Sequence, residues 1–462
     1  MKYQFSDEEI QKQKIKVFSE NPELELVAPC KIGEGVLRLT ANEKEIFSEI
    51  YRKYNSSINF FIPASGSGSR MFQFLYDFLD EPNDENRSQV ERFLNSISDF
   101  AFFKQIPTEM QIVLQNQSIS FEAIVAYLLD KEGLNFGYLP KGLIPFHNNL
   151  KDILNPFQEQ VVLGSELGNT EMSFHFTIQL AFQKEIQNTI HSIKLSQTTF
   201  SEQSIESNSI AFKEDGEVCL NSENEIISRP SGHGALLSHL NQIEKEIVFI
   251  KNIDNVQHPK NSTEASYSWQ VLGGVLLKFK EDASKVFLNP TKESLIELND
   301  NYQLFSNSQI EKCKTSEEIR TLLNRPTRVC GMVKNIGQPG GGPFWINDNG
   351  IVSKQIVEKS QISNNVEQNK ILIQSTHFNP VLIAASPFSL EGKKLELNEF
   401  CDDKKYFIVH KKHHGQKIRF IELPGLWNGG MANWNTIFVE VPNATFSPVK
   451  TVLDLLDEAH VD

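Results

Sequence analysis

The sequence predicts an α/β layer fold, because apolar strand-like runs alternate with helix-like stretches between residues 56 and 400. Three runs rich in β-branched and aromatic residues are expected to form strands: Ile58–Ile62, Ile247–Asn252 and Arg328–Lys334. Four further stretches are expected to form helices: Met71–Leu79, Phe121–Leu129, Ala235–Gln242 and Tyr267–Phe279. This alternation indicates helices layered on a sheet.

The chain divides into three segments around this alternating region. Residues 1–55 are expected to form an N-terminal helical arm, since Ser6 with Glu9 and Thr40 with Glu43 are capping-box patterns. Residues 56–400 are expected to form the core, and residues 401–462 a C-terminal segment that completes the functional site.

Several elements are expected inside these segments. The turn pair Asn349-Gly350 predicts a hairpin over Phe344–Glu358. A strand is expected at Ile371–Ser375, and residues 281–325 are expected to form a helical insert or linker. The C-terminal segment is expected to hold the strand Thr436–Val441 and a last helix from about Thr451.

Composition restricts the class of protein. A chain of 462 residues with 39% apolar residues and 33 Phe can bury a large core. The net charge of −14 disfavours nucleic acid and anionic membranes as partners, so any phosphate site must be a local basic pocket. Five scattered cysteines without a Cys-x-x-Cys pair, no signal-peptide pattern and no long uncharged apolar stretch favour a cytoplasmic protein without structural zinc.

The most informative motif is the Gly/Ser loop that follows the first expected strand. Its small residues can bring backbone N–H groups around phosphate oxygens, and the helix after it adds its positive end. Arg70 can add a bidentate contact to phosphate. A P-loop is excluded because no Lys follows Ser69, and a dinucleotide fingerprint is excluded because Met71 stands where its third Gly belongs. A tight strand-to-helix turn without a ligand remains an equal alternative.

A second glycine-containing stretch, Gly232-His233-Gly234, precedes a helix. Because its glycines lack side chains, the backbone can lie against a flat or anionic ligand. Asp254 follows the expected strand at 247–252, where α/β sheets gather their ligands, and its carboxylate suits Mg²⁺. A turn or cap role for Asp254 is the alternative. Lys141 and Lys450 lie next to prolines that stiffen the backbone, but both also suit an ordinary surface.

Taken together, the motifs resemble those of sugar-nucleotide pyrophosphorylases. The loop is similar to their Gly-x-Gly-Thr-Arg signature, and Pro140-Lys141 with Pro145 resembles their Pro-Lys-x-x-x-Pro element. Asn252-Ile-Asp-Asn resembles Asn-Val-Asp-Asn, Ile356-Val-Glu-Lys-Ser-Gln-Ile resembles Val-Val-Glu-Tyr-Ser-Glu-Ile, and Phe446-Ser-Pro-Val-Lys resembles Phe-Ser-Pro-Leu-Lys. The order of motifs matches the UDP-N-acetylhexosamine and UDP-glucose branch, and the whole chain is most similar to a bacterial domain-of-unknown-function family of this superfamily.

This resemblance implies a GT-A-like, Rossmann-like nucleotidyltransferase core with a mixed sheet. Such a core would join a nucleoside triphosphate, expected to be UTP, to a sugar 1-phosphate and release pyrophosphate. The resemblance implies roles for individual residues. Arg70, Lys141 and Lys450 are catalytic; Ser65, Gly66, Ser67, Gly68, Ser69, Gln203, Gly232, His233 and Gly234 bind the nucleotide; Glu358, His377 and Asn379 bind the sugar; Asp254 binds Mg²⁺.

Two other functions remain open at this stage. A nucleotide-sugar-dependent glycosyltransferase has the same fold, but such enzymes commonly use Asp-x-Asp, which this chain lacks. A non-catalytic protein that binds nucleotides or nucleotide sugars is the third possibility. His233 stands where the characterised enzymes have Asn, and Gln361 where they have an acidic residue, so the base and the sugar are left open.

Overall fold

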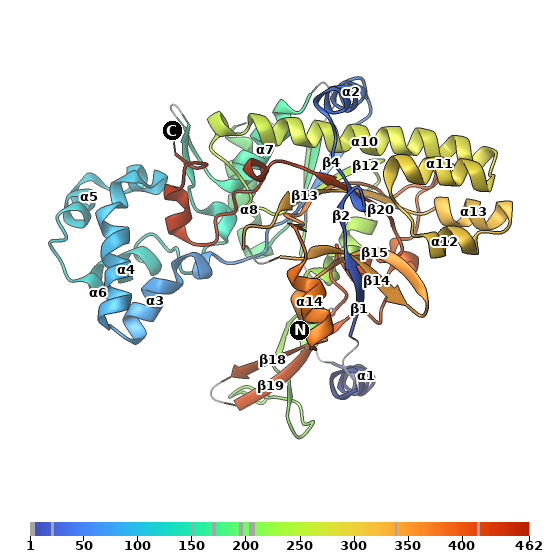
Figure 1. The fold of residues 1–462 in the computed structure, drawn as a ribbon. Helices are drawn as coiled ribbons and strands as arrows, with labels where there is room; N and C mark the ends of the chain where they lie inside the picture. The colour runs from blue at the N-terminus through green and yellow to red at the C-terminus, as the bar shows by residue number, and fades with distance from the viewer. Residues whose placement is uncertain are drawn as a thin grey trace. The chain divides into compact units, whose positions relative to one another are not determined.

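The computed structural model describes residues 5–19, 23–149, 152–168, 172–193, 197–202, 208–337, 340–363, 365–413 and 416–461 (Figure 1). The chain forms two compact units. Unit 1 comprises Met1–Asn59, Gln203–Ile250 and Gln270–Val441, and unit 2 comprises Phe60–Glu202, Lys251–Trp269 and Pro442–Asp462. Each unit gathers three separate stretches of chain, so the units do not coincide with the ranges 1–55, 56–400 and 401–462 suggested by the sequence.

The main sheet of unit 1 has the strand order β2-β3-β20-β13-β17-β12. Its strands are β2 (Lys31–Ile32), β3 (Gly35–Leu37), β20 (Asn435–Glu440), β13 (Thr327–Lys334), β17 (Leu382–Ser386) and β12 (Ile247–Lys251). The pairs β2–β3, β3–β20 and β20–β13 are parallel, whereas β17 and the short β16 (His377–Phe378) run antiparallel to β13. The sheet is therefore mixed and mainly parallel, with β13 buried along nearly its whole length.

Helices and small sheets complete unit 1. The helices are α1 (Asp7–Phe18), α2 (Ala41–Arg52), α9 (Leu237–Asn241), α11 (Lys292–Tyr302), α12 (Asn307–Lys312), α13 (Ser316–Leu323) and α14 (Val366–Ile373). A longer helix, α10 (Thr263–Leu288), begins in unit 2 and belongs to unit 1 from Gln270 onward. The smaller strands are β1 (Glu25–Pro29), β9 (Asn208–Ile210), β10 (Phe212–Lys213), β11 (Ser228–Pro230), β14 (Gly342–Asp348), β15 (Ile351–Val357), β18 (Phe407–His413) and β19 (Gln416–Glu422). Figure 1 shows α11, α12 and α13 grouped beside the end of α10, where the Tyr302 hydroxyl donates to Asp282 at 2.9 Å.

Unit 2 combines a smaller sheet with a helical layer rich in phenylalanine. Its strand order is β4-β7-β8, with β4 (Ile58–Pro63), β7 (Met172–Thr177) and β8 (Gln197–Ser201), and a separate hairpin joins β5 (His147–Asn149) to β6 (Asp152–Leu154). The helices are α3 (Gln73–Asp80), α4 (Asp84–Asn95), α5 (Thr108–Gln115), α6 (Phe121–Leu129), α7 (Pro156–Glu166) and α8 (Gln183–His191). The core around α3 to α6 also contains Val449, Val452 and Leu455 from the end of the chain.

The predicted α/β class with a mixed sheet is confirmed, and many predicted elements lie where the sequence places them. α6 has the predicted bounds, and β4, β12 and β13 match within one residue. The hairpin forms around Asn349 and Gly350, whose φ angles of 51° and 82° suit a tight turn. The insert at 281–325 is helical, and both predicted capping boxes start helices.

Other elements differ from the prediction. The predicted strand at Ile371–Ser375 is wrong, because α14 begins at the cap Asn365 and continues to Ile373. The N-terminal arm contains α1 and α2 and also the strands β1, β2 and β3, which pair with strands far along the chain or with each other. The last helix is a short 3-10 turn, Val452–Leu456. Among the described helices, none is both long and apolar enough for a membrane span.

Candidate functional site

The Gly/Ser loop of unit 2 begins where β4 ends and leads into a 3-10 turn, Gly68–Phe72, followed by α3. The Gly68 N–H donates to the Leu139 carbonyl at 2.8 Å, so this amide is already engaged. A Cβ atom at position 68 would lie 2.5 Å from Ile144 Cδ1 and 3.1 Å from the Leu139 oxygen, which is a packing reason for glycine. At exposed Gly66 a Cβ atom would meet nothing within 4 Å, so the open side of the loop is there.

The polar side chains of the loop are accessible. The hydroxyls of Ser67 and Ser69 are 2.8 Å apart, and the Ser65 carbonyl accepts a hydrogen bond from Gln179 Nε2 at 2.8 Å. Arg70 is exposed and forms no ion pair within the described part of the chain. These groups leave hydroxyls and one guanidinium available to an anion.

Lys141 is tied directly to this loop. Its backbone N–H donates to the Gly66 carbonyl at 3.0 Å, and Pro140 forms a β-bridge with Ser67. The Lys141 ammonium lies 2.7 Å from Asp254 Oδ2, with side-chain exposures of 13% and 24%. The predicted catalytic lysine and the predicted metal ligand therefore form a largely buried ion pair beside the loop.

The C-terminal segment brings Lys450 to the same place. The Val449 N–H donates to the Asp254 carbonyl at 3.0 Å, and Asn255 forms a β-bridge with Pro448. Lys450 follows directly and is exposed. We call the resulting group the Lys141–Asp254 cluster, and it comprises Ser65–Arg70, Lys141, Asp254 and Lys450.

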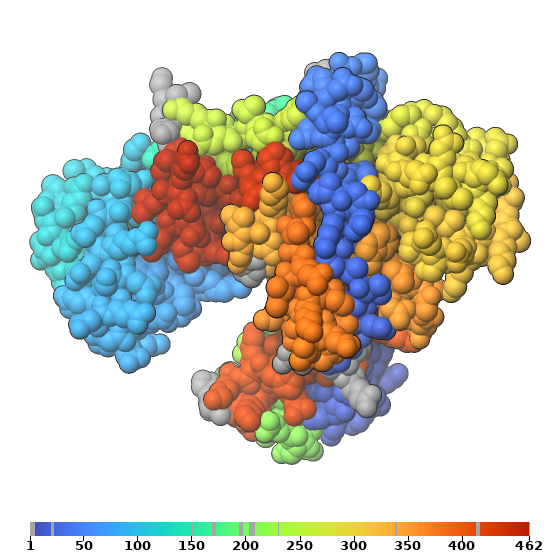
Figure 2. Space-filling view, in the orientation of Figure 1, coloured from blue at the N-terminus to red at the C-terminus, as the bar shows by residue number. Residues whose placement is uncertain are grey.

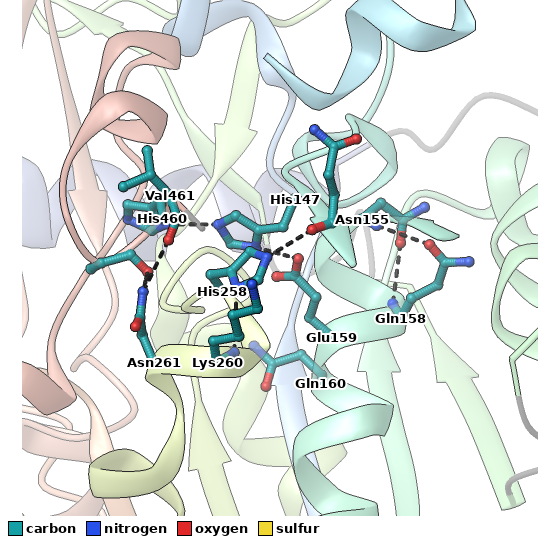
Figure 3. A network of polar contacts seen from close by, with 12 residues as sticks. His147, Asn155, Gln158, Glu159, Gln160, His258, Lys260, Asn261, His460 and Val461 are labelled. Atoms are coloured by element: carbon teal, nitrogen blue, oxygen red, sulfur yellow. Dashed lines mark hydrogen bonds and ion pairs between the residues drawn. The ribbon is translucent and has the colours of Figure 1, made fainter. Parts of the chain in front are cut away.

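Figure 3 shows a buried polar network in unit 2 that includes Glu159 and Gln160 of α7. His147 Nδ1 lies 2.5 Å from Glu159 Oε1 of α7, and His147 Nε2 lies 2.9 Å from His460 Nδ1 near the chain end. Gln160 Nε2 donates to the carbonyls of Asn252 and Ile253 at 3.2 and 3.3 Å. The loop that carries Asp254 is thus fixed by α7 on one side and by the C-terminal segment on the other.

Burial changes the proton affinities of this region. The pKa of His460 is lowered to about 4, first by burial and then by repulsion from His147. The pKa of Lys251 is lowered to about 7 by burial, an effect that the nearby Glu159 carboxylate opposes. His460 is therefore a neutral hydrogen-bonding partner at neutral pH.

In unit 1 the predicted base-binding residue His233 has a defined orientation. Its ring stacks on Trp427 with centroids 4.0 Å apart, and its Nδ1 accepts a hydrogen bond from the Leu426 N–H at 2.8 Å. The proton therefore resides on Nε2, which lies 3.6 Å from Glu358 Oε1. Gly232 precedes the ring with a φ of 78°, and this positive value favours glycine.

Glu358 lies at the centre of this group. The Asn428 amide donates to Glu358 Oε1 and to Gln361 Oε1, both at 3.1 Å. The hydrogen bond from His233 lowers the pKa of Glu358. Burial raises the pKa of the neighbouring Glu422, and the charge of Glu358 adds to that effect. Glu358 is therefore an ionised hydrogen-bond acceptor at neutral pH.

A pocket of about 410 Å³ brings two of the predicted sugar-binding residues together. Glu358 and His377 both line it, as do Gly340 and Gly342 of the glycine-rich loop. His377 Nε2 lies 3.4 Å from Glu440 Oε1, and burial lowers the pKa of the His377 ring. The pocket thus offers the Glu358 carboxylate to a polar ligand, whereas the buried His377 ring already contacts Thr376 and Glu440 through its two nitrogens.

Two predicted residues do not join these groups. Asn379 is buried, its N–H donates to Gly341 at 2.8 Å, and it is absent from the described residues that line the pocket. Gln203 lies outside the described residues. Sequence reasoning missed Trp427, Asn428, Glu422 and the network of His147, Glu159 and His460, because none of them stands in a recognisable local motif.

A family model described as "Domain of unknown function (DUF4301)" matches residues 1–461. The chain belongs to the DUF4301 family. No curated protein matches it significantly.

Solved structures with similar chain traces include a uridine diphosphate N-acetylglucosamine pyrophosphorylase and a UDP-glucose phosphorylase, both from Trypanosoma brucei. The first is 13% identical with a TM-score of 0.47, and covers 93% of the DUF4301 chain and 72% of its own. The second is 12% identical with a TM-score of 0.42. The match covers 94% of the DUF4301 chain and 69% of the UDP-glucose phosphorylase chain.

The DUF4301 chain provides one carboxylate in the Lys141–Asp254 cluster. Within the described ranges, no group of three or more His, Cys, Asp or Glu side chains is arranged to hold a metal ion. Mg²⁺ in phosphate-transfer sites is commonly bound through one or two carboxylates, with phosphate oxygens and water completing its shell. Asp254 therefore fits an ion that arrives with a triphosphate.

The buried His460 predicts a pH-dependent stability. Its pKa of about 4 lies below its ordinary value of 6.5, so between these values the unfolded chain binds a proton that the folded chain excludes. The free energy of unfolding should thus fall as the pH falls through this window, and His460→Gln should reduce that fall by roughly 1–2 kcal/mol. Denaturant unfolding at about pH 7 and about pH 5 measures it; equal losses in both proteins would contradict the assignment.

Substitution of the two glycines of the loop should affect the free energy of unfolding to different extents. Gly68→Ala should reduce the free energy of unfolding by about 1–3 kcal/mol, because the added Cβ meets the backbone of Leu139. Gly66→Ala, the matched control, should change it by less than about 0.5 kcal/mol, because the space there is open. Thermal and denaturant unfolding compare the two variants, and similar losses would refute the packing role of Gly68.

Proposed function

We propose that this DUF4301 protein is a Mg²⁺-dependent nucleotidyltransferase that joins UTP to a sugar 1-phosphate and releases pyrophosphate. The observation that supports this most directly is the Lys141–Asp254 cluster. Hydrogen bonds from Lys141 to Gly66 and from Val449 to Asp254 gather a loop, two lysines and a carboxylate from three separate stretches of unit 2. All of these residues belong to motifs in which the chain resembles sugar-nucleotide pyrophosphorylases.

The chemistry requires positioning and neutralisation of charge more than a covalent nucleophile. A phosphate oxygen of the sugar 1-phosphate attacks the α-phosphorus of UTP in line, and the bond from that phosphorus to the bridging oxygen of pyrophosphate breaks. Arg70, Lys141 and Lys450 are the cations we assign to the phosphates, and the open side of the loop at Gly66 lets the backbone approach them.

The ion pair between Lys141 and Asp254 fits this assignment. Each partner neutralises the other without substrate, which avoids an uncompensated buried charge. In the proposed reaction Lys141 would contact phosphate and Asp254 would hold Mg²⁺. The ion supplies further neutralisation of the triphosphate charge when bound.

Recognition of the base and the sugar is assigned to unit 1. The stacked rings of His233 and Trp427 present a flat, partly exposed surface with a protonated Nε2, which suits a heterocyclic base. Glu358 is an ionised acceptor in the pocket that it shares with His377, which suits sugar hydroxyls. Asn379 is assigned a structural role, since its backbone N–H and its side-chain oxygen bond to the chain.

Loss of either member of the ion pair should reduce catalysis strongly. With UTP, Mg²⁺ and a panel of sugar 1-phosphates, the protein should release pyrophosphate, and Asp254→Asn and Lys141→Met should each lower kcat about 100-fold or more. Asp99→Asn and Lys104→Met change the same residue types at exposed positions of unit 2 and should remain near the wild-type rate.

The measurement is a coupled assay of pyrophosphate release, with a thermal-shift panel of nucleotides and nucleotide sugars beside it. Stabilisation by a uridine compound without pyrophosphate release would favour a non-catalytic binding protein. Wild-type rates in Asp254→Asn would remove this residue from the mechanism. The absence of both stabilisation and product would reject the proposed function.

A further inference from the structure

Unit 1 contains a second, larger pocket that the proposed reaction does not use. It has a volume of about 520 Å³. Its walls come from residues 304–325 of the helical insert, which include α12 and α13, from the hairpin β14–β15, and from residues 432–436, which lead into β20. Figure 2 shows the insert in yellow meeting the hairpin in orange on the surface of this unit. Neither His233 nor Glu358 lines the pocket.

Hydrogen bonds fix the insert to both of the other walls. The Ser306 hydroxyl at the start of α12 donates to the Val352 carbonyl of β15 at 2.6 Å, and the Val352 N–H donates to Ser308 Oγ at 3.1 Å. At the other end, Asn435 Nδ2 donates to the Leu323 carbonyl of α13 at 2.8 Å. The insert is therefore hydrogen-bonded to both of the other walls of the pocket.

The lining carries an excess of positive charge. Lys405 is neutralised by Asp402 at 2.5 Å and by Asp348 at 3.3 Å, and the Glu318 carboxylate accepts hydrogen bonds from the cap of its own helix. Arg325 lines the pocket, and the structure pairs it with no carboxylate among the residues it describes. Burial lowers the pKa of this guanidinium, so the charge is incompletely solvated.

Polar atoms without a hydrogen-bond partner belong to residues of the other two walls. Trp434 Nε1, Gln355 Oε1 and Asn435 Oδ1 belong to residues that are 5%, 3% and 2% exposed, and none has a hydrogen-bond partner in the described structure. Buried polar groups are normally satisfied, so such atoms indicate bound water or a ligand. Phe305 and Leu322 add apolar surface.

We propose that this pocket is a second ligand site, which takes a small organic anion with an aromatic or apolar body. The anionic group pairs with Arg325, where a guanidinium offers bidentate hydrogen bonds to a carboxylate, phosphate or sulfonate. The body packs against Phe305 and the Trp434 side of the pocket. In a chain with a net charge of −14, a cationic pocket attracts anions that the rest of the surface repels. This site does not depend on the proposed reaction.

Two probes that differ only in charge test this proposal. 8-Anilinonaphthalene-1-sulfonate carries a sulfonate on an aromatic body, and N-phenyl-1-naphthylamine has the same rings without the sulfonate. Fluorescence titration of the full chain should show saturable binding of the sulfonate, at least about 10-fold tighter than binding of the uncharged probe. Arg325→Gln should weaken binding of the sulfonate about 10-fold or more and leave the uncharged probe unchanged.

Two further variants complete the design. Arg92→Gln removes an exposed arginine of unit 2 and should keep the wild-type Kd for the sulfonate within about twofold. Thr321→Trp places a large ring at an exposed position of the pocket wall and should block both probes, which tests the site without removing a charge. Circular dichroism confirms folding of each variant. Unchanged binding of the sulfonate in either Arg325→Gln or Thr321→Trp would overturn the proposal.

Discussion

The loop that carries Asp254 is held from two sides, and the whole Lys141–Asp254 cluster depends on this constraint. Gln160 of α7 binds the carbonyls of Asn252 and Ile253, while the Val449 N–H binds the carbonyl of Asp254 itself. The carboxylate is thus placed by backbone hydrogen bonds, and Lys141 is placed against it by the Gly/Ser loop. A largely buried ion pair can persist only where both partners are positioned in this way, since either charge alone is costly.

The fold was predictable where a local pattern decides the structure. The strand β12 begins with an uninterrupted apolar run, Ile247–Ile250, α6 has a continuous helical pattern, and Asn349-Gly350 specifies a turn between two strands. The segment at α14 was mispredicted because a short apolar run suits a helix or a strand equally, and its cap at Asn365 decides the outcome. The strands β1 to β3 were missed because their pairing partners decide their conformation.

The residues of the candidate site were likewise predictable where they stand in a local sequence motif. Lys141, Asp254 and Glu358 stand in motifs with recognisable neighbours, and the structure brings the first two together and gives the third a pocket. His147 and His460 are 313 positions apart, so no local pattern could connect them. Gly68 illustrates a different limit, because a glycine needed for packing has the same letter as one needed for a ligand.

The contribution of the last residues to unit 2 has a consequence for synthesis of the protein. Val449, Val452 and Leu455 are buried in the phenylalanine-rich core whose other members lie mainly between residues 71 and 146. A ribosome releases the chain from its N-terminus, so this core cannot close until residues 449–455 have left the ribosome. Until then the phenylalanine-rich core lacks these three side chains. A chain stopped after Val441 would contain all three stretches of unit 1 but would lack the last stretch of unit 2. Folding of this unit therefore follows synthesis of the whole of unit 1 and requires long-range loop closure.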